Sequence, residues 1–293
     1  MFQVNLDLAG AEWVLVAYFS EDKNMLDVVA SGKSPHVVTG SLITGVPEDW
    51  VLRDHKLIEE QTDANLIHEL RSKEFPELLK HPARFLPRTM SIRQAGKKSN
   101  HALNYGMKYR LFAMNNEVSE AEAKPICEAY STVAYPGIQN YWAGIRRELR
   151  ENDRVLINPF GRKVRLLDEW GHELWMAAYS FKPQSTCTDC TLEGLSVSYE
   201  DVGLPMRLVR FGAQVHDSLL AQVPESMPLR EMAEAIWKIG QNMSPELTIN
   251  RRTFRLNYDA KIGRNWGDMV GLPRAKSVDE MEEGLRRALA KLK

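Results

Sequence analysis

The alternation of hydrophobic and polar positions near the N-terminus predicts a strand followed by a helix. Residues 2–6 (FQVNL) alternate in character and predict a short strand that ends at Asp7. After Gly10, the apolar run 11–19 predicts a buried helix. An Asp at such a junction usually caps the helix, but its carboxylate is also well placed to hold a metal ion at the edge of a sheet.

The middle of the chain is predicted to be mainly helical, with breaks at proline and glycine. An apolar segment follows Ser34–His36, a charged amphipathic helix lies among turns, and a Pro-rich segment leads into a cationic helix. Two further helices are expected on either side of residue 141, the first broken at Pro136–Gly137. In chain order these segments are 37–43, 47–68, 81–87, 89–107, 125–141 and 142–154.

The C-terminal half is predicted to alternate between hairpins and helices. Residues 206–223 (MRLVRFGAQVHDSLLAQV) predict two strands that meet at His216–Ser218, which places Asp217 in a tight turn. Ser277 and Glu280 predict a capping box at the start of the C-terminal helix. The remaining predictions are a hairpin at 155–167, helices at 177–195 and 228–243, and a last strand at 253–262.

The cationic helix at 89–107 carries the first candidate chemistry. Arg93, Lys97, His101 and Tyr105 follow one another at four-residue intervals, so on a helix they share one broad face about 18 Å long. Two cations at one end and two rings at the other suit a ligand with phosphates at one end and a base and sugar at the other. The alternative is a solvated basic helix that happens to carry a tyrosine.

The start of this helix offers a second way to bind phosphate. Thr89 or Ser91 is expected to cap it, which leaves backbone N–H groups and the positive end of the helix dipole near the same phosphates.

Charge distribution adds to this picture, whereas overall composition does not. The net charge is only −1, but no Asp or Glu occurs from residue 78 to residue 116. A surface of one sign within a neutral chain predicts local anion binding. The basic residues of this segment are Lys80, Arg84, Arg88, Arg93, Lys97, Lys98, Lys108 and Arg110.

Several other kinds of site are disfavoured. The three cysteines include a single CxxC, Cys187 and Cys190, too few for a four-ligand zinc site, so reduced intracellular thiols are expected. The sequence has no Walker A or GxGxxG pattern, no membrane-spanning apolar run and no signal-peptide layout.

The two aspartates and the cationic helix together suggest one chemistry. Asp7 and Asp217 lie far apart in sequence, each at the exposed end of a predicted strand. Two divalent cations about 3.5–4 Å apart can activate a hydroxyl and stabilise a leaving pyrophosphate. Magnesium prefers carboxylate oxygens and takes substrate phosphates as its other ligands, so two aspartates suffice. This combination is typical of nucleotidyl transfer.

Three segments carry a resemblance to a known family. DLAGAEW (7–13) looks like motif A, RQAGKKSNHALNYG (93–106) like motif B, and QVHDS (214–218) like motif C. In this order and at these separations, they resemble the C-terminal catalytic part of family A (DNA polymerase I-like) DNA polymerases, in the form common in bacteriophages.

The resemblance implies an α+β fold in the arrangement of a right hand. Residues 1–13 and 155–293 would form the palm, an antiparallel sheet with helices, and residues 14–154 the mainly helical fingers. The motif B helix would cover about 89–107 and the motif C hairpin about 206–223. The thumb and exonuclease domains are expected to be absent. A partner chain of a split polymerase would then supply the thumb and any 3′–5′ exonuclease; a truncated fragment is the alternative.

The resemblance also implies roles for individual residues. Asp7, Asp217 and the carbonyl of Leu8 would bind two Mg²⁺ ions, for which Mn²⁺ can substitute. Arg93 and Lys97 would hold the dNTP triphosphate, and Lys97 would donate a proton to pyrophosphate.

Further residues would contact the nucleotide and the DNA. His36 would lie near the phosphates, and Glu12 would be the steric gate that crowds a ribonucleotide 2′-OH. Tyr105 would lie by the templating pair and pack against Glu12. The weaker assignments to primer–template DNA are Arg162, Gln184 and His216.

Some positions depart from the family pattern. His101 stands where Phe or Tyr usually faces the incoming sugar, and Ser218 replaces the usual Glu of motif C. Ala9 and Gly10 replace more polar residues of motif A.

The expected function is template-directed DNA synthesis during DNA replication, in the cytoplasm of a bacterial host if the chain is phage-encoded. One alternative is a single-subunit RNA polymerase, which commonly has HDS in motif C but which Glu12 disfavours. The other is a non-catalytic DNA-binding fragment.

Overall fold

The computed structural model describes residues 1–59, 61–116 and 118–292, which form two compact units. We call them the sheet unit (1–12, 157–162 and 183–293) and the helical unit (13–156 and 163–182), and describe each by itself. Two of the four boundaries fall inside helices, α1 (Ala11–Ser20) and α11 (His172–Glu200), and a third falls inside the strand β2 (Val155–Ile157).

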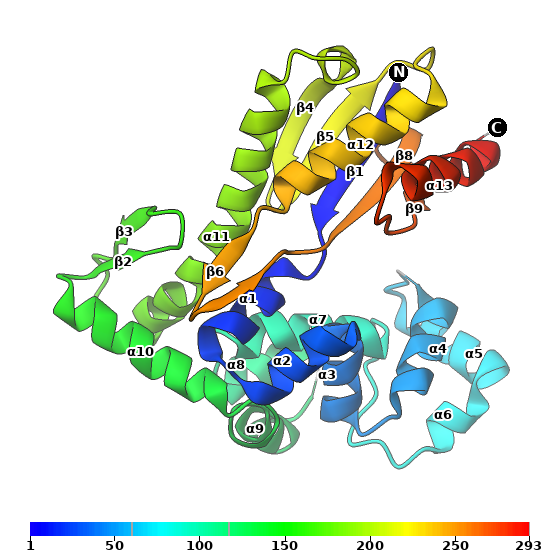
Figure 1. The fold of residues 1–293 in the computed structure, drawn as a ribbon. Coiled ribbons are helices and arrows are strands. Elements are labelled where there is room, and N and C mark those ends of the chain that lie inside the picture. Colours follow the sequence, from blue (N-terminus) through cyan, green and yellow to red (C-terminus); the bar gives the residue numbers. More distant parts are fainter. Residues whose placement is uncertain (60, 117, 293) are drawn as a thin grey trace. The chain divides into compact units, whose positions relative to one another are not determined.

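The sheet unit is built on a five-stranded antiparallel sheet in the order β4-β5-β1-β8-β9 (Figure 1). The N-terminal strand therefore occupies the centre, between strands that come from the C-terminal third of the chain. The strands are β1 (Phe2–Leu8), β4 (Arg210–Val215), β5 (Ser218–Val223), β8 (Tyr258–Asn265) and β9 (Asp268–Leu272). The same unit contains η2 (Met206–Leu208), α12 (Leu229–Met243), β6 (Leu247–Ile249), β7 (Arg252–Phe254) and α13 (Val278–Lys291).

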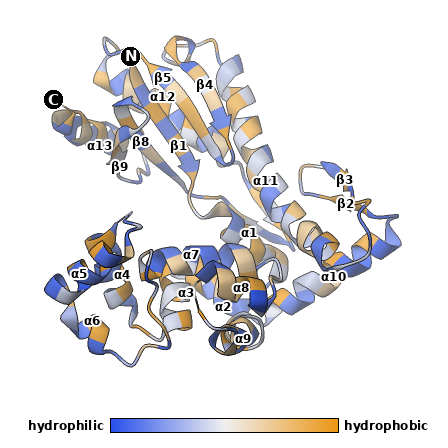
Figure 2. Ribbon diagram, turned by 180° about the vertical axis from the view of Figure 1, so that it is seen from behind, coloured by the Kyte–Doolittle hydropathy of each residue, from blue (hydrophilic) through white to orange (hydrophobic). Residues whose placement is uncertain are grey.

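Strict alternation in β1 gives the sheet one apolar and one polar face. Phe2, Val4, Leu6 and Leu8 are buried, whereas the residues between them are only half-buried. The matching alternation of hydrophobic and hydrophilic residues along β1 appears as orange and blue bands in Figure 2. Helices α12 and α13 pack on the sheet, and Gly240 of α12 lies so close to the ring of Tyr258 that a Cβ would meet it at 2.1 Å. Tyr258 is paired with Leu8, so α12 covers the apolar face and leaves Asp7 on the other.

The helical unit holds the remaining elements. They are α2 (Lys23–Ser31), α3 (Pro35–Thr44), α4 (Glu48–Ile58), α5 (Ala64–Glu74), α6 (Pro76–Lys80), α7 (Ile92–Leu103), α8 (Tyr109–Asn116), α9 (Glu120–Ala129), a π-helical turn η1 (Tyr130–Ala134), α10 (Gly137–Glu151) and the hairpin β2 (Val155–Ile157) and β3 (Lys163–Arg165).

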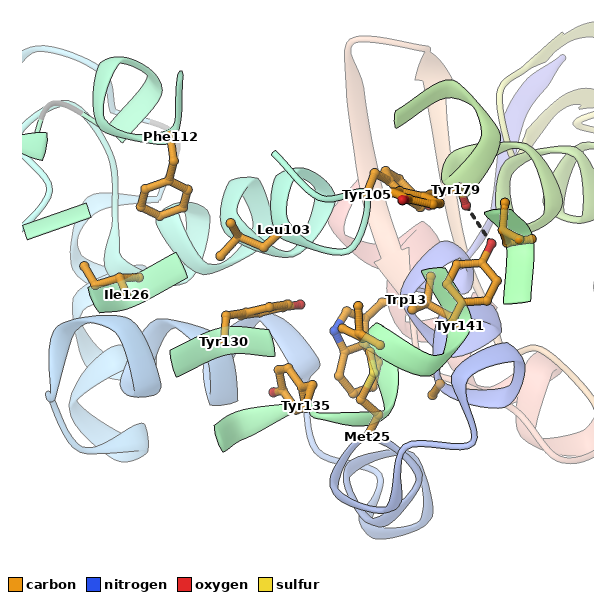
Figure 3. Packing of buried hydrophobic residues seen from close by; sticks show 14 of the residues in the cluster. Trp13, Met25, Leu103, Tyr105, Phe112, Ile126, Tyr130, Tyr135, Tyr141 and Tyr179 are labelled. Atoms are coloured by element: carbon orange, nitrogen blue, oxygen red, sulfur yellow. Dashed lines mark hydrogen bonds between the residues drawn. The ribbon is translucent and has the colours of Figure 1, made fainter. Parts of the chain in front are cut away.

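The core of the helical unit is rich in tyrosine. Trp13 and Tyr130 each meet Tyr135 edge-to-face, with ring centroids 5.8 and 4.9 Å apart (Figure 3). The hydroxyl of Tyr141 donates to the carbonyl of Tyr179 at 2.6 Å, so a buried polar atom is satisfied without leaving the core.

Helices α3 and α7 approach each other through two glycines. A Cβ on Gly96 would lie 2.2 Å from the carbonyl oxygen of His36 and 2.6 Å from the nitrogen of Gly40. A Cβ on Gly40 would lie 2.8 Å from the carbonyl oxygen of Ile92. Only residues without side chains allow this backbone contact, and the contact places His36 beside α7.

Most predicted elements are present with shifted ends. The strand at 2–6 continues to Leu8, the helix at 177–195 extends from His172 to Glu200, and both predicted hairpins form. The predictions around residues 206 and 253 were partly wrong. Residues 206–208 form a 3-10 turn, and the predicted strand at 253–262 is divided into β7 and β8.

Two further predictions need correction. The strand at 253–262 is not the last one, because β9 follows and pairs with β8. At the C-terminal helix, Ser277 accepts from the backbone of Glu280 as expected, but the Glu280 carboxylate accepts from Lys276 N–H and the box is not closed. A complete capping box occurs instead at Ser119 and Glu122.

Candidate functional site

The two motif aspartates lie close together where β1 ends and the β4–β5 hairpin turns. We call Asp7, Leu8 and Asp217 the carboxylate edge. Antiparallel pairing of β1 and β5 places Asp7 opposite Ser218, and the backbone N–H of Leu8 donates to the carbonyl of Asp217 at 3.1 Å. The positions of both aspartates are therefore set by main-chain hydrogen bonds.

The turn of the β4–β5 hairpin is reinforced by Ser218. Its hydroxyl donates to the carbonyl of Val215 at 2.9 Å, across the two residues of the turn. Where the family pattern has a glutamate, this chain therefore has a small residue that is used within the hairpin itself. His216, in the turn, is exposed and has a left-handed backbone (φ 54°).

A third carboxylate, which the sequence analysis did not single out, also lies at this edge. Asp259 on β8 is directly opposite Asp7, and residues opposite each other in an antiparallel pair share a face. Its carboxylate is paired with Arg274 at 2.7 Å, which offsets the repulsion of two like charges. No local pattern marks Asp259, because only the register of β8 against β1 brings it there.

The charges that act on the buried thiol of Cys187 indicate that Glu12 lies near the carboxylate edge. Burial raises the pKa of Cys187 well above its ordinary value, and the charges of Glu12, Asp217 and Asp7 raise it further. Burial also raises the pKa of Cys190 to about 12. Both thiols are therefore protonated at neutral pH.

The three candidate DNA contacts of the sheet unit have different surroundings. Arg162 makes hydrogen bonds of 2.5–3.1 Å to the carboxylate of Asp189, which also accepts from Asn158 at 2.6 Å. Gln184 is exposed on α11, and His216 is exposed in the motif C turn. Their roles at DNA stay predictions.

In the helical unit, the start of α7 is capped by the protein itself. Ser91 accepts from the N–H of Gln94, and the buried carboxylate of Asp54 accepts from the N–H of Ile92 at 2.7 Å. Arg71 neutralises this carboxylate through an ion pair in which its Nε atom lies 2.8 Å from Oδ1 of Asp54. The expectation that Ser91 caps this helix is confirmed. The N–H of Ile92 is not left for a phosphate, because Asp54 already accepts from it.

The cationic face of α7 consists of Arg93, Lys97 and His101. Lys97 and His101 are exposed, whereas Arg93 is half-buried with its Nη1 atom 3.4 Å from Nε2 of His55. An open pocket of about 910 Å³ lies against this helix, and Lys97, His101 and Tyr105 all contribute to its lining. The pocket is large enough for a nucleotide-sized ligand.

Tyr105 differs from the prediction in its backbone. Helix α7 ends at Leu103, so Tyr105 is not a fourth position on its face. The N–H of Met107 returns to the carbonyl of Ala102, and Gly106 has a positive φ of 76°, as in glycine-terminated helices. Tyr105 is buried in the core as well as lining the pocket (Figure 3).

His36 lies beside this face as a buried neutral imidazole. Its ring centroid is 6.3 Å from that of His101. Burial, together with the charges of Arg93, His101 and Lys97, lowers the pKa of His36 to about 3. The ring is therefore uncharged at any pH at which the chain is expected to work.

Asn100, which the sequence analysis did not single out, connects His36 to the core. Its Oδ1 atom lies 2.8–3.1 Å from Thr39 Oγ1, the hydroxyl of Tyr130 and Nε1 of Trp13. Its Nδ2 atom lies 3.2 Å from Nδ1 of His36. Asn100 directly precedes His101 and lies on the buried side of α7. The sequence signal that could have identified it is a polar residue on the buried side of an amphipathic helix.

The described residues contain no cluster of three or more His, Cys, Asp or Glu side chains placed to hold a metal ion. Over the same residues, the helices include none with the length and apolar character needed to cross a membrane.

Comparison with known proteins places this arrangement in a family. Residues 53–268 match the profile of DNA polymerase family A, so the chain belongs to that family. No curated protein matches the chain. Among solved structures, it is similar to the POL domain of Pol1 from M. smegmatis in complex with DNA primer-template and dNTP, at 21% identity and a TM-score of 0.63.

The extent of that structural match is unequal. It covers 91% of this chain but only 40% of the other, and at this identity it shows the fold alone. The chain is thus a family A polymerase domain in which helices accompany an antiparallel sheet, as the resemblance predicted at this coarser level.

Proposed function

We propose that this chain catalyses template-directed DNA synthesis, transferring a nucleotide from a dNTP to a primer 3′-OH. The observation that carries the proposal is the backbone hydrogen bond from Leu8 to Asp217, which joins motifs A and C at one sheet edge. The sheet unit would correspond to the palm and the helical unit mainly to the fingers. A partner chain would supply the thumb and any 3′–5′ exonuclease.

The carboxylate edge suits the two magnesium ions that such a reaction uses. Asp7 and Asp217 supply carboxylate oxygens, and Leu8 supplies a backbone carbonyl, all of them hard donors that Mg²⁺ prefers and Mn²⁺ also accepts. Phosphate oxygens of the substrate would complete the coordination. When bound, the two ions would lower the pKa of the attacking hydroxyl and offset charge on the leaving group.

The cationic face of α7 suits the triphosphate. Arg93 and Lys97 would hold phosphate oxygens through charge-assisted hydrogen bonds, and Lys97 would deliver a proton to pyrophosphate. His36 would add a neutral N–H donor. His101 and Tyr105, which line the same pocket, would contact the sugar and the templating pair.

Glu12 would set the preference for deoxyribonucleotides. It lies near the carboxylate edge, as its effect on Cys187 indicates, and a carboxylate there would crowd a 2′-OH. Glu12→Ala should therefore raise ribonucleotide incorporation relative to deoxyribonucleotide incorporation. An unchanged ratio of the two kcat/KM values would refute this role.

The decisive assay is primer extension with the full chain, labelled dNTPs and Mg²⁺, with Asp217→Ala as the control. Extension that requires Mg²⁺ and disappears in the variant is the expected result. A chain that binds primer–template but extends it neither alone nor with any candidate partner would instead be a DNA-binding fragment. Extension with ribonucleotides in preference to dNTPs would indicate an RNA polymerase.

A further inference from the structure

The orientation of the Asn100 amide is determined by its neighbours. Trp13 Nε1 can only donate a hydrogen bond, and it faces Oδ1 of Asn100 at 3.1 Å. The carbonyl of Pro35 can only accept, and it faces Nδ2 at 3.3 Å. A flipped amide would oppose donor to donor at Trp13 and acceptor to acceptor at Pro35, so one orientation alone satisfies both contacts.

This orientation decides the tautomer of His36. The Nδ2 group of Asn100 lies 3.2 Å from Nδ1 of His36 and has only protons to offer. Nδ1 must therefore accept, and the single proton of the neutral ring resides on Nε2. A protonated ring would place an N–H against the Asn100 amide, and it would do so in a nearly fully buried position.

We propose that Asn100 is a positioning residue that fixes the Nε2–H tautomer of His36, so that His36 offers the nucleotide triphosphate an N–H donor that does not depend on pH. The proposal deepens the function proposed above and rests on it for the triphosphate contact. The tautomer itself rests only on the Trp13–Asn100–His36 chain of hydrogen bonds.

The surrounding charges agree with a neutral ring. From α7, Arg93, Lys97 and His101 oppose a positive charge on His36. On α4, which also packs against α3, His55 contacts Arg93, and the carboxylate of Asp54 is neutralised by Arg71. A cationic anion-binding face thereby gains a hydrogen-bond donor without a further charge to desolvate.

The tautomer is measured directly by NMR of the full chain with ¹⁵N-labelled histidine, using His36→Gln to assign the His36 signals. The expected spectrum shows a neutral ring protonated on Nε2 from about pH 8 down to about pH 5, where ordinary histidines are charged. A ring protonated on Nδ1, or a charged ring at about pH 6, would overturn the proposal. This measurement needs neither activity nor bound nucleotide.

Asn100→Asp tests the positioning role at nearly constant shape. A carboxylate beside Nδ1 should draw the proton there, so the neutral ring changes tautomer and loses its Nε2–H. A spectrum in which the tautomer stays the same in this variant would exclude positioning by Asn100. If the variant does not fold, the wild-type spectrum still decides which nitrogen carries the proton.

Kinetics then test the consequence for the nucleotide. In Asn100→Asp, the KM for dNTP relative to wild type should rise about tenfold from about pH 6 to about pH 8, because only the protonated ring still donates. The control repeats the comparison in chains that carry His36→Gln, since the glutamine amide also donates a hydrogen bond but does not titrate. There, the KM of the Asn100→Asp double variant relative to His36→Gln alone should not change with pH. A ratio independent of pH in both backgrounds would remove His36 from the triphosphate contact. Absence of extension by the wild type would overturn the proposed function instead, and would leave the NMR result intact.

Discussion

The carboxylate edge and the cationic face of α7 are positioned by different kinds of interaction. Asp7 and Asp217 are placed by the hydrogen-bond ladder of a sheet, in which main-chain atoms set the register whatever the side chains are. The cationic face of α7 depends on the residue types that pack around the helix. These are the buried carboxylate of Asp54, the amide of Asn100, and Gly96, whose lack of a side chain lets α3 approach.

This difference has a consequence for mutation. At the carboxylate edge, a substitution should remove chemistry and leave the fold intact. Around α7, substitution of a buried supporting residue should alter both the stability and the placement of the side chains that we propose bind the nucleotide.

The largest effect is expected at the carboxylate edge itself. Asp7→Asn or Asp217→Asn should lower the rate of primer extension by about 10³-fold or more, since each removes charge that in the proposed reaction would hold a metal ion worth several kcal/mol in the transition state. The free energy of unfolding should change by less than about 0.5 kcal/mol, or rise slightly, because like charges are removed. Single-turnover extension and thermal unfolding measure the two quantities.

The matched control is Asp268→Asn, an exposed aspartate of the sheet unit away from motifs A and C. It should retain the wild-type rate. Unfolding of the Asp7 variant, or a full rate in it, would show that the edge is not organised as described.

Asp54→Ala should cause the largest loss of stability in the helical unit. It leaves Arg71 buried without its partner and Ile92 N–H without its acceptor, at a cost of about 3–5 kcal/mol. Denaturant titration would measure this loss of stability, and hydrogen exchange of the α7 amides would locate it. Lys33→Ala, which breaks an exposed ion pair with Glu48, should cost no more than about 1 kcal/mol. Equal losses in the two variants would contradict a structural role for the buried pair.

Gly96→Ala should destabilise the contact between α3 and α7 by about 1–3 kcal/mol, because its Cβ would meet backbone atoms that have little freedom to move. Gly144→Ala on α10 is the control, since nothing lies within 4 Å of its Cβ position. There the better helix propensity of alanine should add about 0.5–1 kcal/mol. Urea denaturation should show a lower free energy of unfolding for Gly96→Ala and a higher one for Gly144→Ala. Stabilisation by both substitutions would refute the close approach of α3 and α7.

The smallest effect is a pH dependence. The pKa of His36 falls from its ordinary value of 6.5 to about 3 in the folded chain, so between these values the unfolded chain binds a proton that the folded chain does not. Stability should therefore decrease as the pH falls through this window, by at most about 1.4 kcal/mol for each pH unit.

The measurement is the urea midpoint at several values from about pH 7 to about pH 5, compared between wild type and His36→Gln. The slope should be shallower in the variant. His68→Gln removes an exposed imidazole and controls for the loss of one histidine. Identical slopes in wild type and His36→Gln would show that His36 is not held neutral.

Much of the fold was predictable because its signals are local. Strict alternation in residues 2–8 marks the central strand, a two-residue turn marks Asp217, and three short motifs identify the family. Ser277 and Pro228 mark the starts of α13 and α12 at the expected places.

The errors lie where local signals compete. Residues 253–262 look like one strand, but the chain turns away after Phe254 before β8 enters the sheet. The four-residue spacing from Arg93 to Tyr105 suggests one long helix, but Gly106 allows the reversal that ends it at Leu103.

By itself, the sequence determined the order of most elements and the family to which the chain belongs, and it supplied the candidate residues for the chemistry. Only the tertiary structure decided that Asp259 faces Asp7, that Asn100 holds His36 and that Asp54 caps α7. The physical reason is that periodicity and turn residues express burial along a single segment. Strand register and buried hydrogen-bond networks instead join residues that are far apart in sequence, and these form only when the segments pack.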